Sequence, residues 1–334
     1  MVNIREYIFD LARKTKGKII LPESFDLRIL KAAQIITEEN IGSVVLPVHS
    51  IEEFKNIALK ADINLSGVDI IEIDKTLLDE KMIVDFVDVR EKKGMSAQYA
   101  LDLLNRPLYF SMMYLKSGKC DACVGGAVYD TADILRAGIH VIGPAEDVKI
   151  ISSYFLMIPP DGHTVAKEPI IFADCGVNPE PQSIGLKDIV VATVKSFKKI
   201  FPTRQANVAM LSFSTKGSSR SKVLSKVIEA TKLAKDYFAG QSDINIDGEL
   251  QFDASIMLSV AKRKAPDSPV AGNANILIFP DLNSGNIAYK IAERYGGFQA
   301  LGPIIQGLAL PVSDLSRGVG SSDICLISAL MLIK

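Results

Sequence analysis

The sequence has almost no excess charge: 38 Lys and Arg residues stand against 39 Asp and Glu residues, a formal net charge of -1. This balance excludes the basic patch with which a domain binds nucleic acid or an anionic membrane. A long apolar run is also missing, because the C-terminal stretch 324–333 is far shorter than the roughly 20 residues of a membrane-spanning helix. We therefore expect a cytoplasmic protein with small-molecule partners, no nucleic acid and no membrane, in which a few placed arginines recognise anions.

Cysteine and histidine are scarce as well. The four cysteines are too few and too unevenly placed for a disulfide framework, so we expect reduced thiols. Cys120 and Cys123 form a C-x-x-C, but no second pair of Cys or His follows at the spacing of metal ligands. The three histidines stand beside no acidic residue, so a Ser-His-Asp arrangement has no local support. These observations favour a chain without a metal site.

Two phosphate-binding fingerprints are absent too. No G-x-G-x-x-G follows the first predicted strand at 18–22, which weakens a nicotinamide-binding interpretation. The loop 214–219 (Ser-Thr-Lys-Gly-Ser-Ser) has the wrong glycine and lysine spacing for a Walker A loop. Its hydroxyls and its glycine, at the start of a predicted helix, still favour an anion seat.

Short apolar strands alternate with amphipathic helices along the whole chain. This alternation is typical of parallel sheets covered by helices, and the length of 334 residues favours two domains. The alternation of strands and helices changes near 142–145, and residues typical of a turn follow at 159–162 (Pro-Pro-Asp-Gly). We therefore predict two doubly wound α/β domains with a cleft between them: domain I at 1–146 plus 316–334, and domain II at 147–315.

Polar loops follow several predicted strands, at the edge where open α/β sheets bind their ligands. One is the loop 214–219 and another is the loop 280–286. In a third, Asp247 and Glu249 place two carboxylates close together. Such a pair would suit metal binding or acid–base work, while N-capping of a helix by Asp247 is an equal alternative.

The stretch 311–323 carries the most chemistry. Three groups lie on one loop: the hydroxyl of Ser316 as a neutral donor, the planar guanidinium of Arg317 with several donors, and the carboxylate of Asp323 as a proton acceptor. Gly318 and Gly320 would let this loop adopt positive φ or approach a ligand closely. The alternative is a surface loop that caps the final helix, with Ser321 or Ser322 as the N-cap.

Several strings, in their joint order, make the chain resemble the phosphate acetyltransferase (phosphotransacetylase) family. They are Met210 to Ser218, Asp247 to Ala254, Asn275 to Asn286, Gly302 to Arg317, Gly126 to Arg136, and Leu21-Pro22-Glu23 with Asp26 and Arg28. The resemblance covers essentially the whole chain. It implies reversible acetyl transfer between acetyl phosphate and coenzyme A, in a homodimer whose subunits have a fold like that of isocitrate and isopropylmalate dehydrogenases. It also implies no metal and no prosthetic group, with coenzyme A as a substrate.

The resemblance also implies roles for individual residues. The catalytic set is Ser316, Arg317 and the thiol-activating Asp323. The substrate phosphate is expected at Arg90, Thr131, Arg136 and Arg317. Residues expected to line the cleft along coenzyme A are Ser214, Lys216, Asp281, Asn283, Gly318 and Gly320. Where the family commonly has a cysteine-serine pair, this chain has Val319-Gly320 with unchanged spacing, so we expect no sensitivity to thiol reagents there.

The residues fit direct transfer. Arginine forks suit the phosphoryl end of acetyl phosphate, and a base is useful because a free thiol is mostly protonated at neutral pH. Ser316 has no histidine partner in sequence, which favours a hydrogen-bond donor over a covalent nucleophile. Three alternatives remain: a phosphate butyryltransferase, a non-catalytic acyl-coenzyme A binding domain, and a decarboxylating dehydrogenase that needs metal and nicotinamide.

Overall fold

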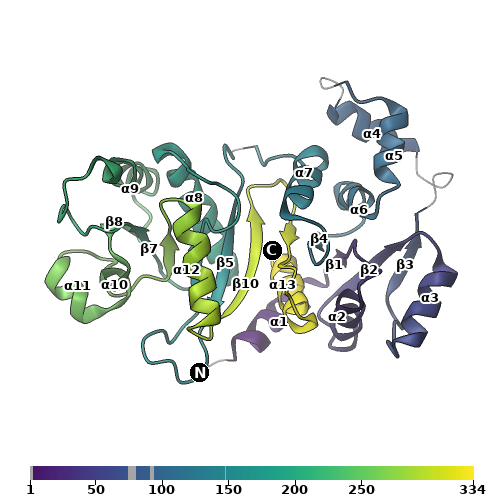
Figure 1. The fold of residues 1–334 in the computed structure, drawn as a ribbon, viewed down its shortest axis with the longest axis horizontal. Helices are drawn as coiled ribbons and strands as arrows, with labels where there is room; N and C mark the ends of the chain where they lie inside the picture. The colour runs from purple at the N-terminus through teal and green to yellow at the C-terminus, as the bar shows by residue number, and fades with distance from the viewer. Residues whose placement is uncertain (1–2, 74–79, 91–93, 147) are drawn as a thin grey trace. The chain divides into compact units, whose positions relative to one another are not determined.

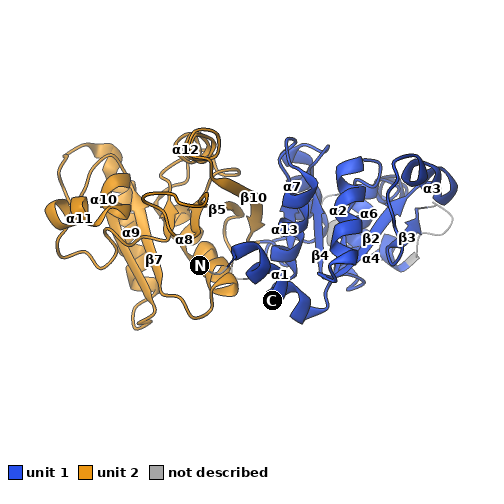
Figure 2. Cartoon of the chain, turned by 90° about the horizontal axis from the view of Figure 1, so that it is seen from below, with its two compact units in different colours: residues 1–146, 308–334 blue, residues 147–307 orange. Residues whose placement is uncertain are grey.

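The structure is a computed structural model that describes residues 3–73, 80–90, 94–146 and 148–334. Its contacts divide the chain into two compact units, one of residues 1–146 and 308–334 and one of residues 147–307 (Figure 2). The predicted domain I ends its first stretch at the same residue, 146, but its second stretch is expected to begin at 316. Residues 308–315 belong with unit 1 because the strand 312–314 pairs there with the strand 122–125. The predicted cleft stays a prediction.

Unit 1 is built on a parallel sheet. Its strands run in the order β3 (Asp69–Glu72), β2 (Ser43–Val48), β1 (Lys18–Ile20), β4 (Ala122–Gly125) and β11 (Val312–Asp314). The helices among its described residues are α1 (Ile4–Thr15), α2 (Leu27–Glu38), α3 (Ile51–Lys60), α4 (Glu80–Arg90), α5 (Ala97–Leu104), α6 (Pro107–Lys116), α7 (Thr131–Val141) and α13 (Ser321–Leu332) (Figure 1). The central strands are apolar and buried, as in sheets covered on both faces.

The C-terminal helix α13 is the core helix of unit 1. All its residues from Ile324 to Leu332 are buried, and it packs against α1, α2 and β4. Gly320 is its N-cap, and no side chain caps it. The alternative that Ser321 or Ser322 caps this helix is therefore wrong.

Unit 2 has a mixed sheet. Its strands run in the order β10 (Gln299–Gln306), β5 (Ser152–Ile158), β6 (Ile170–Ala173), β9 (Ile276–Ile278), β7 (Ala206–Leu211) and β8 (Ile244–Leu250). The last four are parallel, whereas β5 pairs antiparallel with both β6 and β10. Its helices are α8 (Ser183–Ile200), α9 (Ser225–Tyr237), α10 (Phe252–Ile256), α11 (Leu258–Lys264), α12 (Leu282–Arg294) and the 3-10 turn η2 (Lys222–Leu224). The predicted α/β class is confirmed, with this antiparallel part added.

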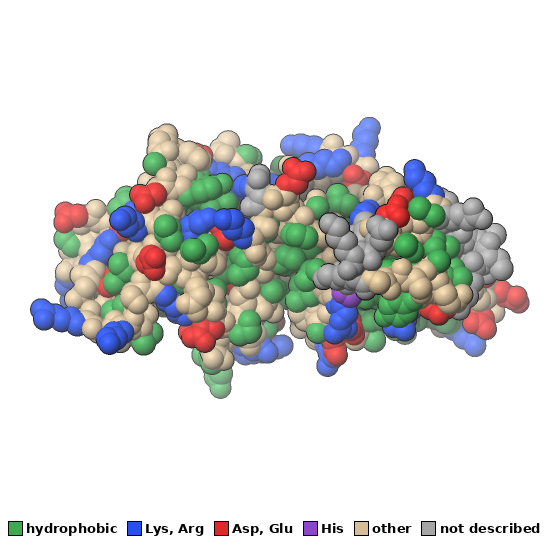
Figure 3. Space-filling model, turned by 90° about the horizontal axis from the view of Figure 1, so that it is seen from above, with side chains coloured by type: hydrophobic (Ala, Val, Ile, Leu, Met, Phe, Trp, Pro, Cys, Tyr) green, Lys and Arg blue, Asp and Glu red, His purple; other side chains and the backbone are tan. Residues whose placement is uncertain are grey.

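The surface matches the balanced composition. Basic and acidic side chains are interspersed over the face drawn in Figure 3, without a broad patch of one sign. None of the described helices is long and apolar enough to cross a membrane.

Candidate functional site

A buried carboxylate organises the loop that follows β4. Glu23 has no exposed surface, and its two oxygens accept hydrogen bonds from the four consecutive backbone amides of residues 126–129, at 2.7 to 3.0 Å. Hydrogen bonds to a charged acceptor are the strong ones in proteins. Glu23 therefore fixes the backbone that leads into α7. Its partners lie 103 to 106 residues away in the chain, so the sequence alone did not reveal this role.

Glu23→Gln should lower the free energy of unfolding by about 3 kcal/mol, because hydrogen bonds to charged groups contribute about 1.5–3 kcal/mol and the new amide nitrogen cannot accept from the buried N–H groups. Chemical denaturation would measure the loss, and acyl transfer should fall with it. The exposed Glu52 offers a matched control, since Glu52→Gln should change stability by less than about 0.5 kcal/mol. Equal stability of the two variants would contradict this role.

Arg28 ties this loop to the loop that carries Ser316 and Arg317. Its guanidinium donates to the carbonyl oxygens of Arg317 at 2.6 Å, of Val319 at 3.3 Å and of Ala127 at 2.9 Å. Asp26 holds the guanidinium through both carboxylate oxygens, at 3.0 and 2.7 Å. One charged side chain thus keeps two loops in register, which explains what Asp26 and Arg28 contribute to the unit.

The loop after β11 meets the start of α7. The exposed guanidinium of Arg317 forms an ion pair with the carboxylate of Asp130. Asp130 is the N-cap residue of α7 by position, yet its side chain makes no capping hydrogen bond. Thr131, one residue further on, donates from Oγ1 to Oδ2 of Asp314 at 2.5 Å. Two of the predicted phosphate ligands, Arg317 and Thr131, therefore lie in one contact network with Asp314.

Asp314 is a residue that the sequence analysis missed. It is 1% exposed, and its Oδ1 has no hydrogen-bond partner among the residues that the structure describes. Burial raises the pKa of this carboxyl to about 7, and the negative charge of Glu23 adds to the shift. The hydrogen bond from Thr131 lowers the pKa, and so does the nearby backbone amide of Leu315, which donates to the carbonyl oxygen of Gly125. Its position just before Leu-Ser-Arg in the sequence was the available signal.

Gly126 has to be glycine at this point. Its φ is +108°, and a Cβ there would lie 2.1 Å from Oδ1 of Asp314 and 2.5 Å from the amide nitrogen of Leu315. Gly318 and Gly320 are different, because neither has a positive φ and added Cβ atoms would meet almost nothing. The expectation of positive φ at these two glycines is wrong. Close approach of a ligand there stays a prediction.

The remaining predicted residues of unit 1 fall in separate places. Arg136 lies on α7 and donates to Asp133 at 2.7 Å, with more than half of its side chain exposed. It lines a cavity of about 500 Å³ together with Arg106, Tyr129 and His49. Arg106 was not singled out from the sequence. Arg90 ends α4, but its side chain lies outside the described residues.

Ser316 precedes the turn that leads into α13, and Asp323 lies in the first turn of that helix. Ser316 is exposed, and its Oγ accepts from the amide of Gly318 at 3.4 Å. Asp323 is partly buried in the first turn of α13, where its amide donates to the carbonyl oxygen of Gly320. Arg28 bonds the backbone of Arg317 and Val319, which lie between these two residues in the chain.

In unit 2, the loop 214–219 is closed on itself. Ser214 is buried, and its Oγ donates to Oε1 of Glu249 at 3.0 Å, which also accepts from the amide of Gly217 at 2.7 Å. The other amides from 215 to 219 donate to acceptors of the same loop or of Glu249. The predicted anion seat is therefore already filled by the protein's own carboxylate.

Lys216 and Asp247 form a second closed pair. Lys216 donates to Oδ1 of Asp247 at 2.5 Å and Lys235 to the same oxygen at 2.8 Å. Burial raises the pKa of the Asp247 carboxyl, but hydrogen bonds from the two lysines outweigh this, and the pKa lies below its usual value. Asp247 lies inside β8 and caps no helix, so that alternative is wrong. No group of three or more His, Cys, Asp or Glu placed to hold a metal ion occurs in the described part of the chain.

The loop after β9 begins α12. Asp281 is the N-cap of this helix and accepts from the amide of Ser284 at 2.8 Å. Asn283 is exposed in the first turn.

All four cysteines are buried free thiols, and burial raises the pKa of Cys120 to about 12.

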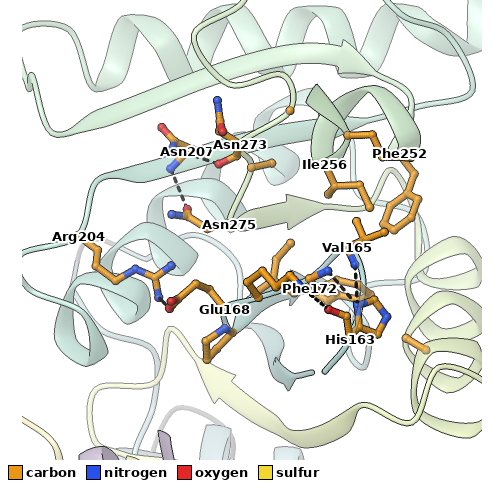
Figure 4. A pocket seen from close by; sticks show the side chains of 18 of the residues that line it. His163, Val165, Glu168, Phe172, Arg204, Asn207, Phe252, Ile256, Asn273 and Asn275 are labelled. Carbon is orange, nitrogen blue, oxygen red and sulfur yellow. Dashed lines mark hydrogen bonds and ion pairs between the residues drawn. The ribbon is translucent and has the colours of Figure 1, made fainter. Parts of the chain in front are cut away.

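A cavity in unit 2 lies at the other end of its sheet. It encloses about 820 Å³ at the amino ends of β6, β7 and β9, beside Phe172, Asn207 and Asn275 (Figure 4). The Arg204 and Glu168 ion pair lies at one side of the view and His163 at the other. The predicted ligand loops follow the carboxyl ends of these strands, so none of the residues predicted from the sequence lines this cavity.

Comparisons with known proteins agree with the resemblance. The family described as phosphate acetyl/butaryl transferase matches residues 3–332. The phosphate acetyltransferase of Clostridium acetobutylicum is 41% identical over 333 residues, which cover 100% of this chain and 98% of the relative. A solved phosphotransacetylase from Staphylococcus aureus superposes with a TM-score of 0.89 at 37% identity, covering 99% of this chain and 98% of that one. The 4-hydroxythreonine-4-phosphate dehydrogenase of Klebsiella pneumoniae, at 12% identity, a TM-score of 0.52 and coverage of 95% and 98%, shares the fold alone.

Proposed function

This chain belongs to the phosphate acetyl/butaryl transferase family, and we propose that it transfers an acetyl group reversibly between acetyl phosphate and coenzyme A. The match over the whole chain and the 41% identity to a phosphate acetyltransferase support the activity. The observation that carries it is the Arg28 contact, which holds the backbone of Arg317 and of the loop before α7 together. This arrangement supports the proposal that Arg317 and Thr131 bind the phosphoryl group.

The proposed reaction is a direct attack within a ternary complex. Arg317, Thr131, Arg136 and Arg90 bind the phosphoryl group of acetyl phosphate. Asp323 takes the proton from the thiol of coenzyme A, and the thiolate attacks the acetyl carbonyl carbon while the bond to the phosphate oxygen breaks. Ser316 donates a hydrogen bond to the oxygen on which negative charge develops. Inorganic phosphate leaves and the thioester remains on coenzyme A.

Several other features are proposed with this function. Coenzyme A is a substrate, and the transfer needs no metal and no prosthetic group, as the chemistry of the family implies. Coenzyme A is proposed to lie along Lys216, Asp281, Asn283, Gly318 and Gly320. The hydroxyl of Ser214 is buried and supports the loop 214–219 instead. The enzyme acts as a cytoplasmic homodimer.

Purified protein, acetyl phosphate and coenzyme A test the activity through the ultraviolet absorbance of the thioester. The rate should survive a chelator and should need no nicotinamide, because neither takes part in the proposed transfer. Absence of thioester would overturn the function. Butyryl phosphate in the same assay decides the acyl preference, and a faster rate than with acetyl phosphate would favour the butyryltransferase.

Ser316→Ala should slow turnover by about 10- to 100-fold without abolishing it, as expected for the loss of one hydrogen bond of about 1–3 kcal/mol in the transition state. Steady-state rates would measure the effect. Ser322→Ala removes a nearby exposed hydroxyl that accepts a hydrogen bond from Arg5, and it should leave turnover within about twofold. An acetyl-serine adduct at Ser316, seen by mass spectrometry, would refute the donor role.

A further inference from the structure

Asp314 has no part in the proposed reaction, although it contacts Thr131, one of the proposed phosphoryl ligands. The residue is buried, its Oδ2 holds the hydroxyl of Thr131 at 2.5 Å, and its Oδ1 lies against Gly126 without a hydrogen-bond partner among the described residues. Resting on the proposed function, in which Thr131 binds the phosphoryl group, we propose that Asp314 is a positioning residue that takes up one proton when the anion binds. Its protonation decides in which direction the hydroxyl of Thr131 donates.

The protonation state of Asp314 sets the number of donors available to an anion. A hydroxyl has one proton to donate, and an ionised carboxylate can only accept. While Asp314 is ionised, the hydroxyl of Thr131 donates its hydrogen bond to Oδ2. Only the lone pairs of Oγ1 then face an incoming anion. When Oδ2 is protonated, it donates to Oγ1 of Thr131, and the threonine proton is free for a phosphate oxygen. One proton from solvent is thus bound for each anion, and no bond between heavy atoms changes.

The surroundings make this exchange accessible near neutral pH. Burial and the charge of Glu23, in the loop after β1, raise the pKa of Asp314 to about 7. Other titratable or charged groups on elements packed against β11 are Cys123 of β4, Asp133, Arg136 and His140 of α7, Asp323 and Cys325 of α13, and the Asp130 and Arg317 pair. An anion placed beside Thr131 would raise the pKa further, because like charges disfavour the ionised carboxyl.

The sign of the pH dependence follows. Anion affinity is complete below the pKa of the free enzyme and falls as pH rises through about 7, by up to about tenfold per pH unit until the pKa of the bound state is reached. Sulfate is the probe, because it mimics phosphate and keeps a charge of two throughout this range. Calorimetry from pH 6 to 8.5, in buffers of different ionisation enthalpy, yields both the affinity and the number of protons bound.

Wild type should lose about tenfold in sulfate affinity between pH 6 and 8 and take up about 0.5 to 1 proton per sulfate above pH 7. Asp314→Asn should take up none and keep its affinity, because the amide always donates to Thr131. At pH 8.5 this variant should bind sulfate more tightly than wild type, which a merely structural defect would not produce. A wild-type pH slope retained in Asp314→Asn, or no slope in wild type, overturns the inference.

Two further substitutions keep the test decisive if Asp314→Asn fails to fold. Thr131→Ser retains the hydroxyl and should retain the slope, whereas Thr131→Val should lose it. A slope that survives in Thr131→Val refutes the inference. Asp161→Asn, an exposed carboxylate of unit 2, should follow wild type. Calorimetry needs no turnover, so absent acetyl transfer with an intact proton count would sink the proposed function alone, and the reverse result the inference alone.

Discussion

Arg317→Ala lowers the turnover of acetyl phosphate with coenzyme A by about 100- to 1000-fold, the loss typical when one charge-stabilising donor is removed from an active site. The side chain is 70% exposed, and its guanidinium forms an ion pair with the carboxylate of Asp130. Exposed ion pairs contribute about 0–1 kcal/mol, so a phosphoryl group can replace Asp130 at little cost. The guanidinium is thus available to a dianion while its backbone stays fixed by Arg28.

Further variants separate the contribution of the planar pair of guanidinium donors of Arg317 from that of its positive charge. Arg317→Lys retains a positive charge but not the planar pair of donors, so it should recover only part of the rate. Arg294→Ala removes an arginine of similar exposure from α12 in unit 2 and should leave the rate within about twofold. Turnover of Arg317→Ala within tenfold of wild type would exclude Arg317 as the phosphoryl ligand.

The local patterns of the sequence predicted most of the fold. Neighbouring residues are enough to predict short apolar strands such as β5 and β9, of seven and three residues. They also predict capped helices such as α2, which begins after Asp26. The pairing of β5 with both neighbours in antiparallel sense was not predictable in this way, because strand direction depends on how the chain returns to the sheet. The assignment of 308–315 to unit 1 depends likewise on a pairing 189 residues apart, between Ser313 and Val124.

The candidate site was predictable in its residue types and less so in its contacts. Ser316, Arg317 and Thr131 were identified through the family resemblance, but Glu23, Arg28 and Asp314 act on partners 99 to 291 residues away. In the loop 214–219, the hydroxyls and glycine suggested an anion seat, whereas Glu249 already occupies its donors. The composition of a loop shows which groups can donate to an anion. Only the fold shows whether a carboxylate of the protein already accepts from those donors.

Asp323→Asn lowers turnover by about 100- to 1000-fold at pH 7, as expected for loss of a general base. The asparagine side chain has nearly the same shape but cannot take the proton of the coenzyme A thiol. A free thiol has a pKa of about 8.5, so the thiolate fraction rises by a total of about 50-fold between pH 6.5 and 8.5. The deficit of Asp323→Asn should therefore shrink as pH rises and be smallest above pH 8.5.

This pH rescue distinguishes the base from the phosphoryl ligand. Arg317→Ala lacks a donor that no pH restores, so its deficit should stay constant over the same range. Asp236→Asn removes an exposed carboxylate of α9 and should match wild type at every pH. If the deficit of Asp323→Asn stays constant up to pH 9, the carboxylate does not act on the thiol, and its position in the first turn of α13 serves the helix instead, where a negative charge stabilises the N-terminus by about 0.3–1 kcal/mol.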